Sequence, residues 1–289
     1  MINYYFARSI PMPGFMLHLA EGQMILNKLN RINASDKSKQ SKAGYRPIHT
    51  EADFIHDFMC GCMLPDAISD KELTHFRPLW QKELITKYPD MDYIMDTYAN
   101  IISTACDFGI LAHLHLDSLY VCSYWKQHFI FEDIHGTETT VHKDIHHVRL
   151  LRDNSHIPYH EFFSTKYFYG DYDILNPYIY KAVQPYIPDV YDIPPEQIHI
   201  KECKNYDADF LADCMKDYVL SDASPNQPCE INNNTTDCYT VNKNTVNKFS
   251  QKHADIPLTR IFPYNSILKF LDNTANEYVK LLKEHHFLK

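Results

Sequence analysis

Glycine is scarce in this sequence: 7 glycines occur in 289 residues, against 21 tyrosines and 16 phenylalanines. All-β folds need many tight turns, and glycine supplies the backbone conformations that such turns require. Phosphate-binding loops of nucleotide-binding folds are also glycine-rich, and neither GxGxxG nor GxxxxGK[ST] occurs in the chain. The scarcity of glycine therefore argues against both an all-β fold and a loop-based nucleotide site.

The sequence also has no excess of basic residues. It contains 28 Lys and Arg against 37 Asp and Glu, which gives a net charge of −9. Proteins bind nucleic acids through clustered Lys and Arg, so we expect no stable nucleic-acid binding. A small phosphate ester is still compatible with an acidic chain, because bound metal cations can invert the local field.

Long apolar runs and paired cysteine motifs are missing as well. No run of 18 apolar residues occurs, so we expect no transmembrane segment. Residues 1–16 contain Arg8 and two prolines and make a poor signal peptide. The eight cysteines form no CxxC pair, which argues against a zinc ribbon. These features predict a cytoplasmic protein with free thiols.

Apolar residues recur at helical spacing along most of the chain, and strand-like alternation is rare. The pattern predicts an all-α fold with one helical domain over residues 1–289. Helices are expected over residues 15–29, 51–63, 91–131 with a break near 107–109, and 171–183. Pro177 is expected in a first helical turn.

The C-terminal third contains a strongly polar stretch followed by an amphipathic one. Residues 221–247 are rich in Asn, Ser and Thr, which predicts a flexible polar insertion. Residues 264–284 place leucines at helical spacing, which predicts a C-terminal helix.

Histidine is abundant, with 17 residues in the chain, and one of them stands in a metal-ligand arrangement. His113 and Asp117 are four residues apart, so on a helix they share one face about 5–6 Å apart. Imidazole and carboxylate suit zinc, and the two side chains could ligate one ion or two adjacent ions. His128 returns close to this face on the same helix, and Glu132 follows four residues later. The alternative is that His113 and Asp117 are a hydrogen-bonded pair in the core that binds no metal.

Two other segments place His or Asp beside apolar residues. Asp66 follows Pro65 in CMLPDAISDKELTHF, where a carboxylate held on a turn can project into a cavity, and His75 lies nine residues further on. His18 lies within the apolar stretch MPGFMLHLAEG. Considered singly, Asp66 would most often be a helix N-cap, and His18 would most often be a core histidine bonded to the backbone. Their occurrence together with His113 and Asp117 favours a shared metal site.

The order of these motifs resembles a known enzyme family. An early His after an MP[GA]F-like start, LPDA followed by a His, and GxxxHxxxD on a long helix are similar to zinc-dependent phospholipase C and its P1-nuclease relatives. The similarity is closer to the uncharacterised bacterial proteins of the zinc-dependent phospholipase C family, and it covers residues 12–176. It implies a multihelical fold, clustered zinc ions and the following metal ligands: His18, Asp66, His75, His113 and Asp117.

The sequence departs from the family at several positions. The secreted enzymes use an N-terminal Trp as a ligand, whereas the only tryptophans here are Trp80 and Trp125. The later His and HxxxE motif of the family has no clean match. The candidate replacements are His128, Glu132, Asp171 and Asp173, together with the histidines between residues 142 and 160. One or two zinc ions are therefore expected rather than three.

These observations predict a metal-dependent hydrolase of phosphate esters, with a small phosphate ester or lipid head group as substrate. Metal-activated water would attack phosphorus, and Asp66 is the candidate bridging or general-base carboxylate. A helical phosphohydrolase of the HD type is an alternative, in which His56 and Asp57 would act with His18 and Asp117. A third hypothesis is a non-catalytic helical protein with a degenerate or structural metal site that binds a partner.

Overall fold

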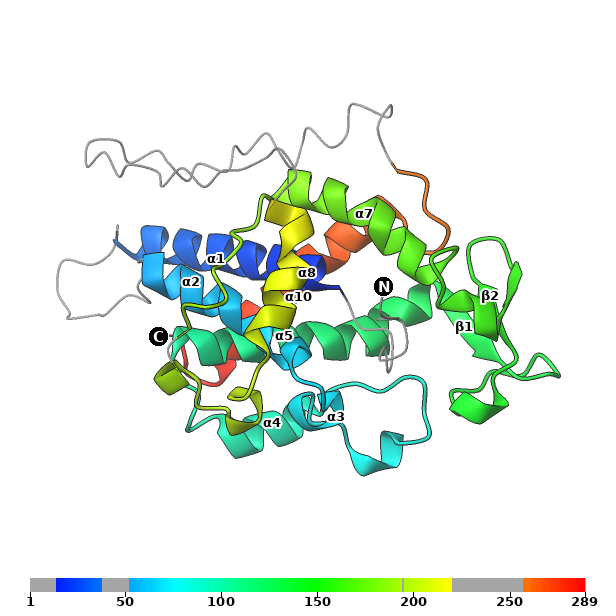
Figure 1. The fold of residues 1–289 in the computed structure, drawn as a ribbon, viewed down its shortest axis with the longest axis horizontal. Coiled ribbons are helices and arrows are strands. Elements are labelled where there is room, and N and C mark those ends of the chain that lie inside the picture. Colours follow the sequence, from blue (N-terminus) through cyan, green and yellow to red (C-terminus); the bar gives the residue numbers. More distant parts are fainter. Residues whose placement is uncertain (1–13, 38–51, 194, 220–256, 289) are drawn as a thin grey trace.

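The computed structural model describes residues 14–37, 52–193, 195–219 and 257–288 (Figure 1). The described part of the chain is mostly helical, and the expected insertion at 221–247 lies outside it. The helices are α1 (Phe15–Lys37), α2 (Ala52–Gly61), α3 (Lys71–Thr74), α4 (Met91–Tyr98), α5 (Ala105–Leu119), α6 (Tyr159–Phe162), α7 (Phe168–Val183), α8 (Ala208–Val219) and α10 (Tyr264–Glu284). The range of α10 is the same as that of the predicted C-terminal helix.

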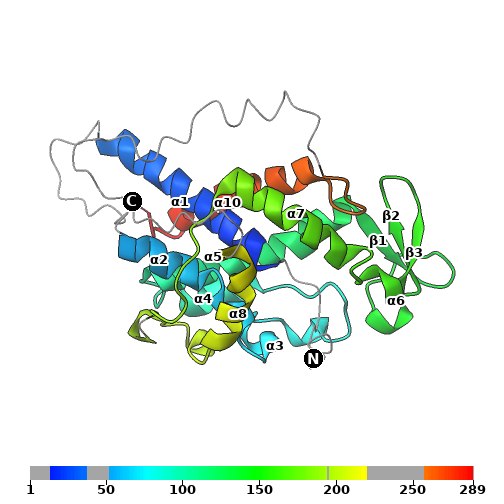
Figure 2. The same ribbon diagram turned by 45° about the horizontal axis from the view of Figure 1, so that its top comes forward.

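A small sheet accompanies the helices, and the prediction of an all-α fold, which holds for the mostly helical described residues, did not include it. Strands β1 (Phe129–Glu132), β2 (His147–Leu150) and β3 (His156–Pro158) form an antiparallel sheet in the order β1-β2-β3. Figure 2 shows the sheet with α6 at one end of the molecule, beyond the ends of α5 and α7. Strands of three or four residues are too short for their alternation to stand out in the sequence.

Helix α5 packs most closely against α2, and two glycines make this approach possible. A Cβ atom on Gly109 of α5 would lie 2.0 Å from the Phe58 carbonyl oxygen of α2. A Cβ atom on Gly61 would lie 2.1 Å from the Cys106 carbonyl oxygen. Only glycine allows two helix backbones to approach this closely. The contact places the end of α2 against the N-terminal part of α5.

The break predicted near residues 107–109 lies earlier in the structure, before the start of α5. The helices separate at residues 99–104, and α5 begins with a capping box in which the side chains of Thr104 and Asp107 accept each other's backbone N–H groups. Asp107 therefore starts the helix instead of ending its predecessor. Gly109 lies inside α5, where it serves the contact with α2.

Helix α5 ends earlier than the sequence pattern predicted. A π-helical turn over Tyr120–Tyr124 and a 3-10 turn over Trp125–Gln127 follow it, and then the chain enters β1. His128 and Glu132 are consequently outside the helix that carries His113. The π-helical and 3-10 turns rotate the chain by a different angle per residue than an α-helix does. His128 and Glu132 therefore do not share a helix face with His113 and Asp117.

Helix α7 begins before Asp171, at Phe168, and Pro177 lies in its interior. Pro177 is exposed, as is Asp173 one turn earlier. The carbonyl group of Asp173 loses its helical N–H partner at Pro177 and lies on the exposed side, where water can hydrate it. The predicted first-turn position of Pro177 is therefore wrong.

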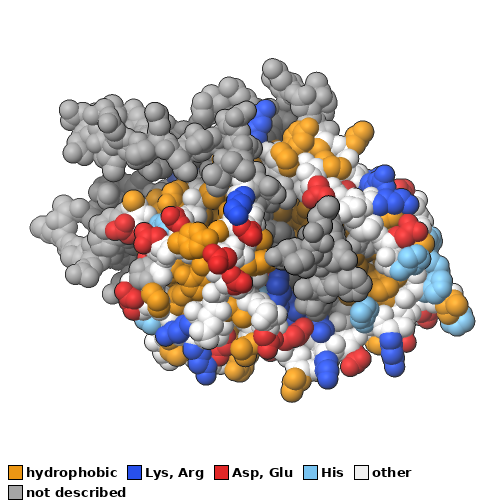
Figure 3. Space-filling model, in the orientation of Figure 1, with side chains coloured by type: hydrophobic (Ala, Val, Ile, Leu, Met, Phe, Trp, Pro, Cys, Tyr) orange, Lys and Arg blue, Asp and Glu red, His pale blue; other side chains and the backbone are white. Residues whose placement is uncertain are grey.

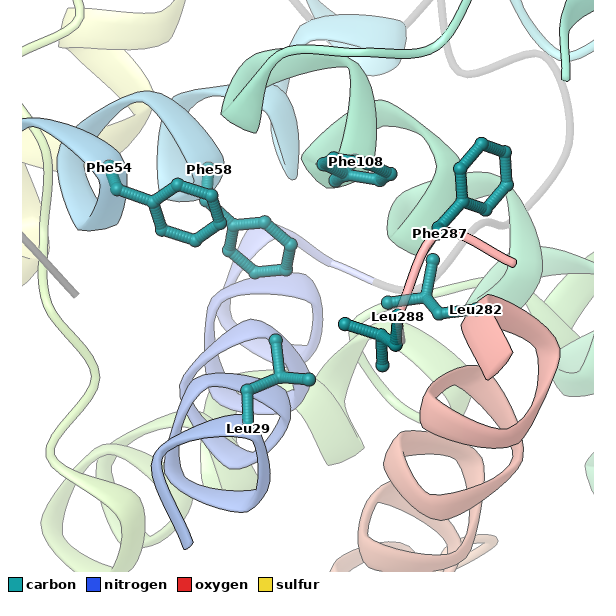
Figure 4. Close-up of a pocket in the computed structure, with 7 residues that line it drawn as sticks. All are labelled: Leu29, Phe54, Phe58, Phe108, Leu282, Phe287 and Leu288. Atoms are coloured by element: carbon teal, nitrogen blue, oxygen red, sulfur yellow. The ribbon is translucent and has the colours of Figure 1, made fainter. Parts of the chain in front are cut away.

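Buried apolar residues form two clusters. The first cluster joins parts of α1, α2, α4, α5, α8 and the C-terminal half of α10. Figure 4 shows its edge, where Phe287 and Leu288 lie beside Phe108 of α5 and Leu29 of α1 around a small apolar pocket. The second cluster is rich in aromatic rings and joins the sheet, α7, the turns after α5 and the N-terminal half of α10. Leu114 and Leu116 of α5 belong to different clusters, so α5 crosses the boundary between them.

None of the helices in the described residues has the length and apolar character needed to span a bilayer. Five cysteines of the described residues are free thiols: Cys60, Cys62, Cys106, Cys122 and Cys203.

Candidate metal centre

Three separate segments bring the five predicted ligands together where α1 and α5 cross the boundary of the two apolar clusters. His18 lies on α1, while His113 and Asp117 lie on α5. Asp66 lies in a short 3-10 turn after α2, with Pro65 in its first turn, and His75 follows α3 directly. All five residues are buried, at 0–5 % exposure. So many ionisable groups are buried together only when they are paired or bind a metal.

The five side chains form two overlapping sets of candidate ligands. His18, Asp66 and His113 each offer an atom within 4.8 Å of the others, and so do His75, His113 and Asp117. These are the only such sets among the residues that the structure describes. Because His113 belongs to both sets, the geometry suits one ion or two neighbouring ions. A mixed set of imidazoles and carboxylates is typical of zinc sites.

Asp117 lies at the centre of the cluster. One of its carboxylate oxygens, Oδ2, lies 3.1 Å from His75 Nε2 and 3.5 Å from His113 Nε2. The other, Oδ1, lies 3.4 Å from His18 Nε2. The imidazole rings of His18 and His113 stack with centroids 3.7 Å apart and planes 6° apart. A single carboxylate thus contacts histidines from three segments.

Several of these buried polar atoms have no hydrogen-bond partner. They are both ring nitrogens of His18 and both carboxylate oxygens of Asp117. Buried polar groups in proteins are hydrogen-bonded in the large majority of cases. Four unpaired atoms in one small volume are the pattern expected of ligands that bind an ion.

Backbone carbonyl groups orient two of the histidines. His113 Nδ1 lies 2.9 Å from the Cys62 carbonyl oxygen, and His75 Nδ1 lies 2.9 Å from the Lys71 carbonyl oxygen. A carbonyl group only accepts, so each Nδ1 carries a proton and donates it. The two Nε2 atoms, 3.3 Å apart, therefore face the cluster. Metal-binding histidines are commonly held in this way, with the second ring nitrogen donating to a carbonyl group.

Burial and neighbouring charges set the protonation of the cluster. Burial beside His113 lowers the pKa of His18 to about 3, and burial also lowers the pKa of His75. Burial would lower the pKa of His113 too, but the carboxylates of Asp117 and Asp66 outweigh it and raise this pKa. Burial opposes the charge of Asp117, yet His113 and His75 hold its pKa well below the ordinary value. Asp117 is therefore ionised and His18 and His75 are neutral, the forms that bind metals, whereas the raised pKa of His113 means that this residue has to release a proton when it binds a metal.

Lys71 is a member of the site that the sequence motifs did not indicate. Its ammonium nitrogen lies 2.6 Å from Asp66 Oδ1. The Lys71 side chain is 27 % exposed, in contrast to the buried ligands, so it marks the side of the cluster nearest to solvent. Burial would raise the pKa of Asp66, but Lys71 and the histidines lower it to about 2. A carboxylate with so low a pKa is a weak base and a good ligand.

Glu21 is the second residue that the motifs missed. It lies three residues after His18 on α1, it is 1 % exposed, and its Oε1 atom has no hydrogen-bond partner. Burial and the charge of Asp117 raise its pKa well above the ordinary value. The i,i+3 spacing of His18 and Glu21 in HLAE was the available signal, because such pairs share a helix face.

The three additional candidate ligands lie elsewhere. His128 packs on Tyr124 with ring centroids 4.4 Å apart, and Ser266 Oγ lies 3.3 Å from its Nε2 atom. Glu132 lies in the sheet and accepts a hydrogen bond from Arg149. Asp171 accepts hydrogen bonds from the backbone N–H groups of residues 260, 261 and 262 and so anchors the segment before α10. None of the three reaches the buried cluster.

The pair required by the HD alternative also lies outside the cluster. His56 Nδ1 is 3.1 Å from Asp57 Oδ1, and His56 Nε2 is 2.9 Å from the Asp189 carbonyl oxygen. His18 and Asp117 contact each other and belong to the cluster on α1 and α5. The arrangement therefore does not favour the HD type of site.

No protein-family model, curated protein or solved structure matches this chain. The resemblance to zinc-dependent phospholipase C stays a prediction that rests on the motifs and on the geometry of their residues.

Proposed function

We propose that this protein is a metal-dependent hydrolase of phosphate esters that binds one or two zinc ions through His18, Asp66, His75, His113 and Asp117. The observation that carries the proposal is the cluster of unpaired, buried His and Asp atoms around Asp117. Their chemistry fits zinc because imidazole nitrogen and carboxylate oxygen are its usual ligands besides thiolate. The free thiols are consistent with our further proposal of a reducing, cytoplasmic location.

Bound zinc would supply a Lewis acid that acidifies water and offsets negative charge on phosphate oxygens. The residues of the chain have to orient the ligands and bind the substrate. The Cys62 and Lys71 carbonyl groups keep the His113 and His75 rings in place. Asp66 lies beside the partly exposed Lys71, so it is also the ligand closest to an incoming substrate. Its low pKa makes it a weak base, so it remains our candidate catalytic carboxylate as a bridging ligand and not as the group that accepts a proton from water.

The positive charge of Lys71 favours an anionic substrate. An ammonium group donates up to three hydrogen bonds, and one of them goes to Asp66. The others can be donated to the non-bridging oxygens of a phosphate group. Hydrogen bonds between charged groups are stronger than those between neutral groups, which favours phosphate over an uncharged carboxylic ester.

The first test is metal analysis of the full chain purified without a histidine tag or added metal. We expect retained zinc, loss of p-nitrophenyl phosphate or bis(p-nitrophenyl) phosphate hydrolysis after chelation, and recovery when zinc is restored. A chain that neither contains nor takes up metal in the cluster would refute the proposal. Stoichiometric zinc without hydrolysis of any phosphate ester would favour the structural metal site, which the strong burial of the cluster also suits.

The Lys71→Met variant tests the choice of substrate. We expect unchanged zinc content and a value of kcat/KM for phosphate esters that is lower by roughly tenfold to a hundredfold, the range for a hydrogen bond to a charged group. The matched control is Lys87→Met, which also removes a lysine from an ion pair, in this case 3.1 Å from Glu72. Equal activity of the two variants would show that Lys71 does not bind the substrate.

A further inference from the structure

The sheet carries a second group of histidines that the proposed hydrolase does not use. Six histidines lie between residues 135 and 160, and Figure 3 shows histidine side chains gathered at the end of the molecule that carries the sheet. These residues belong to β1–β3 and their connections, whereas the buried cluster belongs to α1, α5 and the segments around α3.

The strand register places Glu132, His147 and His156 on one face of the sheet. Glu132 of β1 pairs with His147 of β2, and His147 pairs with Pro158 of β3. His156 lies two residues before Pro158, and residues two apart in a strand point to the same side. One imidazole or carboxylate is thus supplied by each of the three strands.

Glu132 is buried and has an oxygen available. It is 4 % exposed, and its Oε1 atom accepts a hydrogen bond of 2.5 Å from Arg149 Nε. The other oxygen, Oε2, has no hydrogen-bond partner and lies 3.1 Å from His156 Nε2. Carboxylates that bind metals are often held by a second hydrogen bond, which is the role that Arg149 has here.

The four candidate side chains form two close pairs. Two ligand atoms at zinc–nitrogen or zinc–oxygen bond lengths in a tetrahedral site lie roughly 3.3 Å apart. Glu132 Oε2 and His156 Nε2 are 3.1 Å apart, and His146 Nδ1 and His147 Nε2 are 3.0 Å apart. The rings of His147 and His156 are perpendicular, with centroids 6.0 Å apart. No three of these four residues place ligand atoms within 4.8 Å of one another in this structure, so a common ion requires the exposed His156 side chain (51 %) to rotate toward His147.

We propose that Glu132, His147 and His156, with His146 as the fourth ligand, form a surface site for zinc or another late first-row transition-metal ion. Imidazoles with one carboxylate suit Zn²⁺, Cu²⁺ and Ni²⁺. The ion connects all three strands and stabilises a sheet whose strands are only three or four residues long. The site does not depend on the proposed hydrolase.

The test uses the full chain, stripped with chelator and then equilibrated with zinc by dialysis. The variant His147→Ala/His156→Ala is expected to bind one ion fewer per chain than the unmodified protein. The matched control is His142→Ala/His160→Ala, which removes two exposed histidines from the same region. Equal ion content in all three proteins would overturn the proposal, and so would an equal loss in both variants, since that would show nonspecific binding by surface histidines.

Two further measurements separate this site from the buried cluster. Zinc is expected to slow amide hydrogen exchange in β3 of the unmodified protein and of Asp117→Asn, but not in the double variant. Glu132→Gln, which keeps the size of the side chain, is expected to weaken binding of the surface ion by at least about tenfold. Unchanged exchange in β3 on addition of zinc would refute the cross-strand site even if the buried cluster bound metal normally.

Discussion

Replacing Asp117 with asparagine is expected to remove zinc from the buried cluster and to lower phosphate-ester hydrolysis by at least about 100-fold. The carboxylate of Asp117 contacts His18, His75 and His113 at 3.1–3.5 Å, so it joins all three segments of the site. Asparagine has nearly the same size but no negative charge, and its amide NH₂ group cannot bind a cation. The variant therefore removes the central ligand and leaves the packing almost unchanged.

The measurements are zinc per chain after dialysis, hydrolysis of p-nitrophenyl phosphate, and circular dichroism as a check of helix content. Asp173→Asn is the matched control, because it makes the same substitution at an exposed carboxylate on α7. The control is expected to keep zinc and activity. If Asp117→Asn kept the full zinc content of the cluster, the assignment of Asp117 as a ligand would be wrong. Zinc loss with unchanged hydrolysis would refute the metal-dependent reaction.

The second large effect is expected for Gly109→Ala, which should destabilise the fold by about 3 kcal/mol or more. The new Cβ atom would lie 2.0 Å from the Phe58 carbonyl oxygen, so α2 and α5 have to move apart. Alanine has the higher helix propensity, by about 1 kcal/mol, but that gain is smaller than the cost of the overlap. Separation of the helices also moves the Cys62 carbonyl oxygen away from His113 Nδ1, which it now meets at 2.9 Å.

Thermal unfolding and zinc affinity measure the two consequences. We expect a Tm lower by roughly 6 °C or more, together with weaker zinc binding in the folded variant. Gly14→Ala is the control, because a Cβ atom at Gly14 has no neighbour within 4 Å. A Tm equal to that of the control would contradict the close contact of α2 and α5. A lower Tm with unchanged zinc affinity would show that this contact does not position His113.

Three of the candidate ligands could be found from local signals in the sequence, whereas His18 and His75 were indicated by the order of the motifs in the family resemblance. His113 and Asp117 share a helix face through i,i+4 spacing, and Asp66 follows a proline that fixes its turn. Glu21 also had a local signal, since it is three residues from His18, but a single Glu on a helix is usually exposed. Lys71 had none, because its contact with Asp66 depends on how the chain turns between α2 and α3.

The sheet and the residues around it could not be predicted in the same way. The helical periodicity of α5 continues in the sequence through His128 to Glu132, but the chain changes to a π-helical turn, then a 3-10 turn, then β1. Each strand is stabilised by its pairing with another strand, and periodicity within one short segment does not record that pairing. His128 and Glu132 were therefore assigned to a helix face that they do not share.

Apolar spacing within single segments was enough to predict the helical character of the chain and the range of α10, and the order of the motifs indicated the five side chains of the buried cluster. Only the tertiary fold brings α1, α5 and the turns around α3 together, so that the ligand atoms of each candidate set lie within 4.8 Å of one another. The tertiary fold also places His128, Glu132 and Asp171 away from this cluster. The physical reason is that segments far apart in the chain come together through contacts that no single segment encodes. Here these contacts are the close approach of two helix backbones at Gly61 and Gly109 and the pairing of the strands.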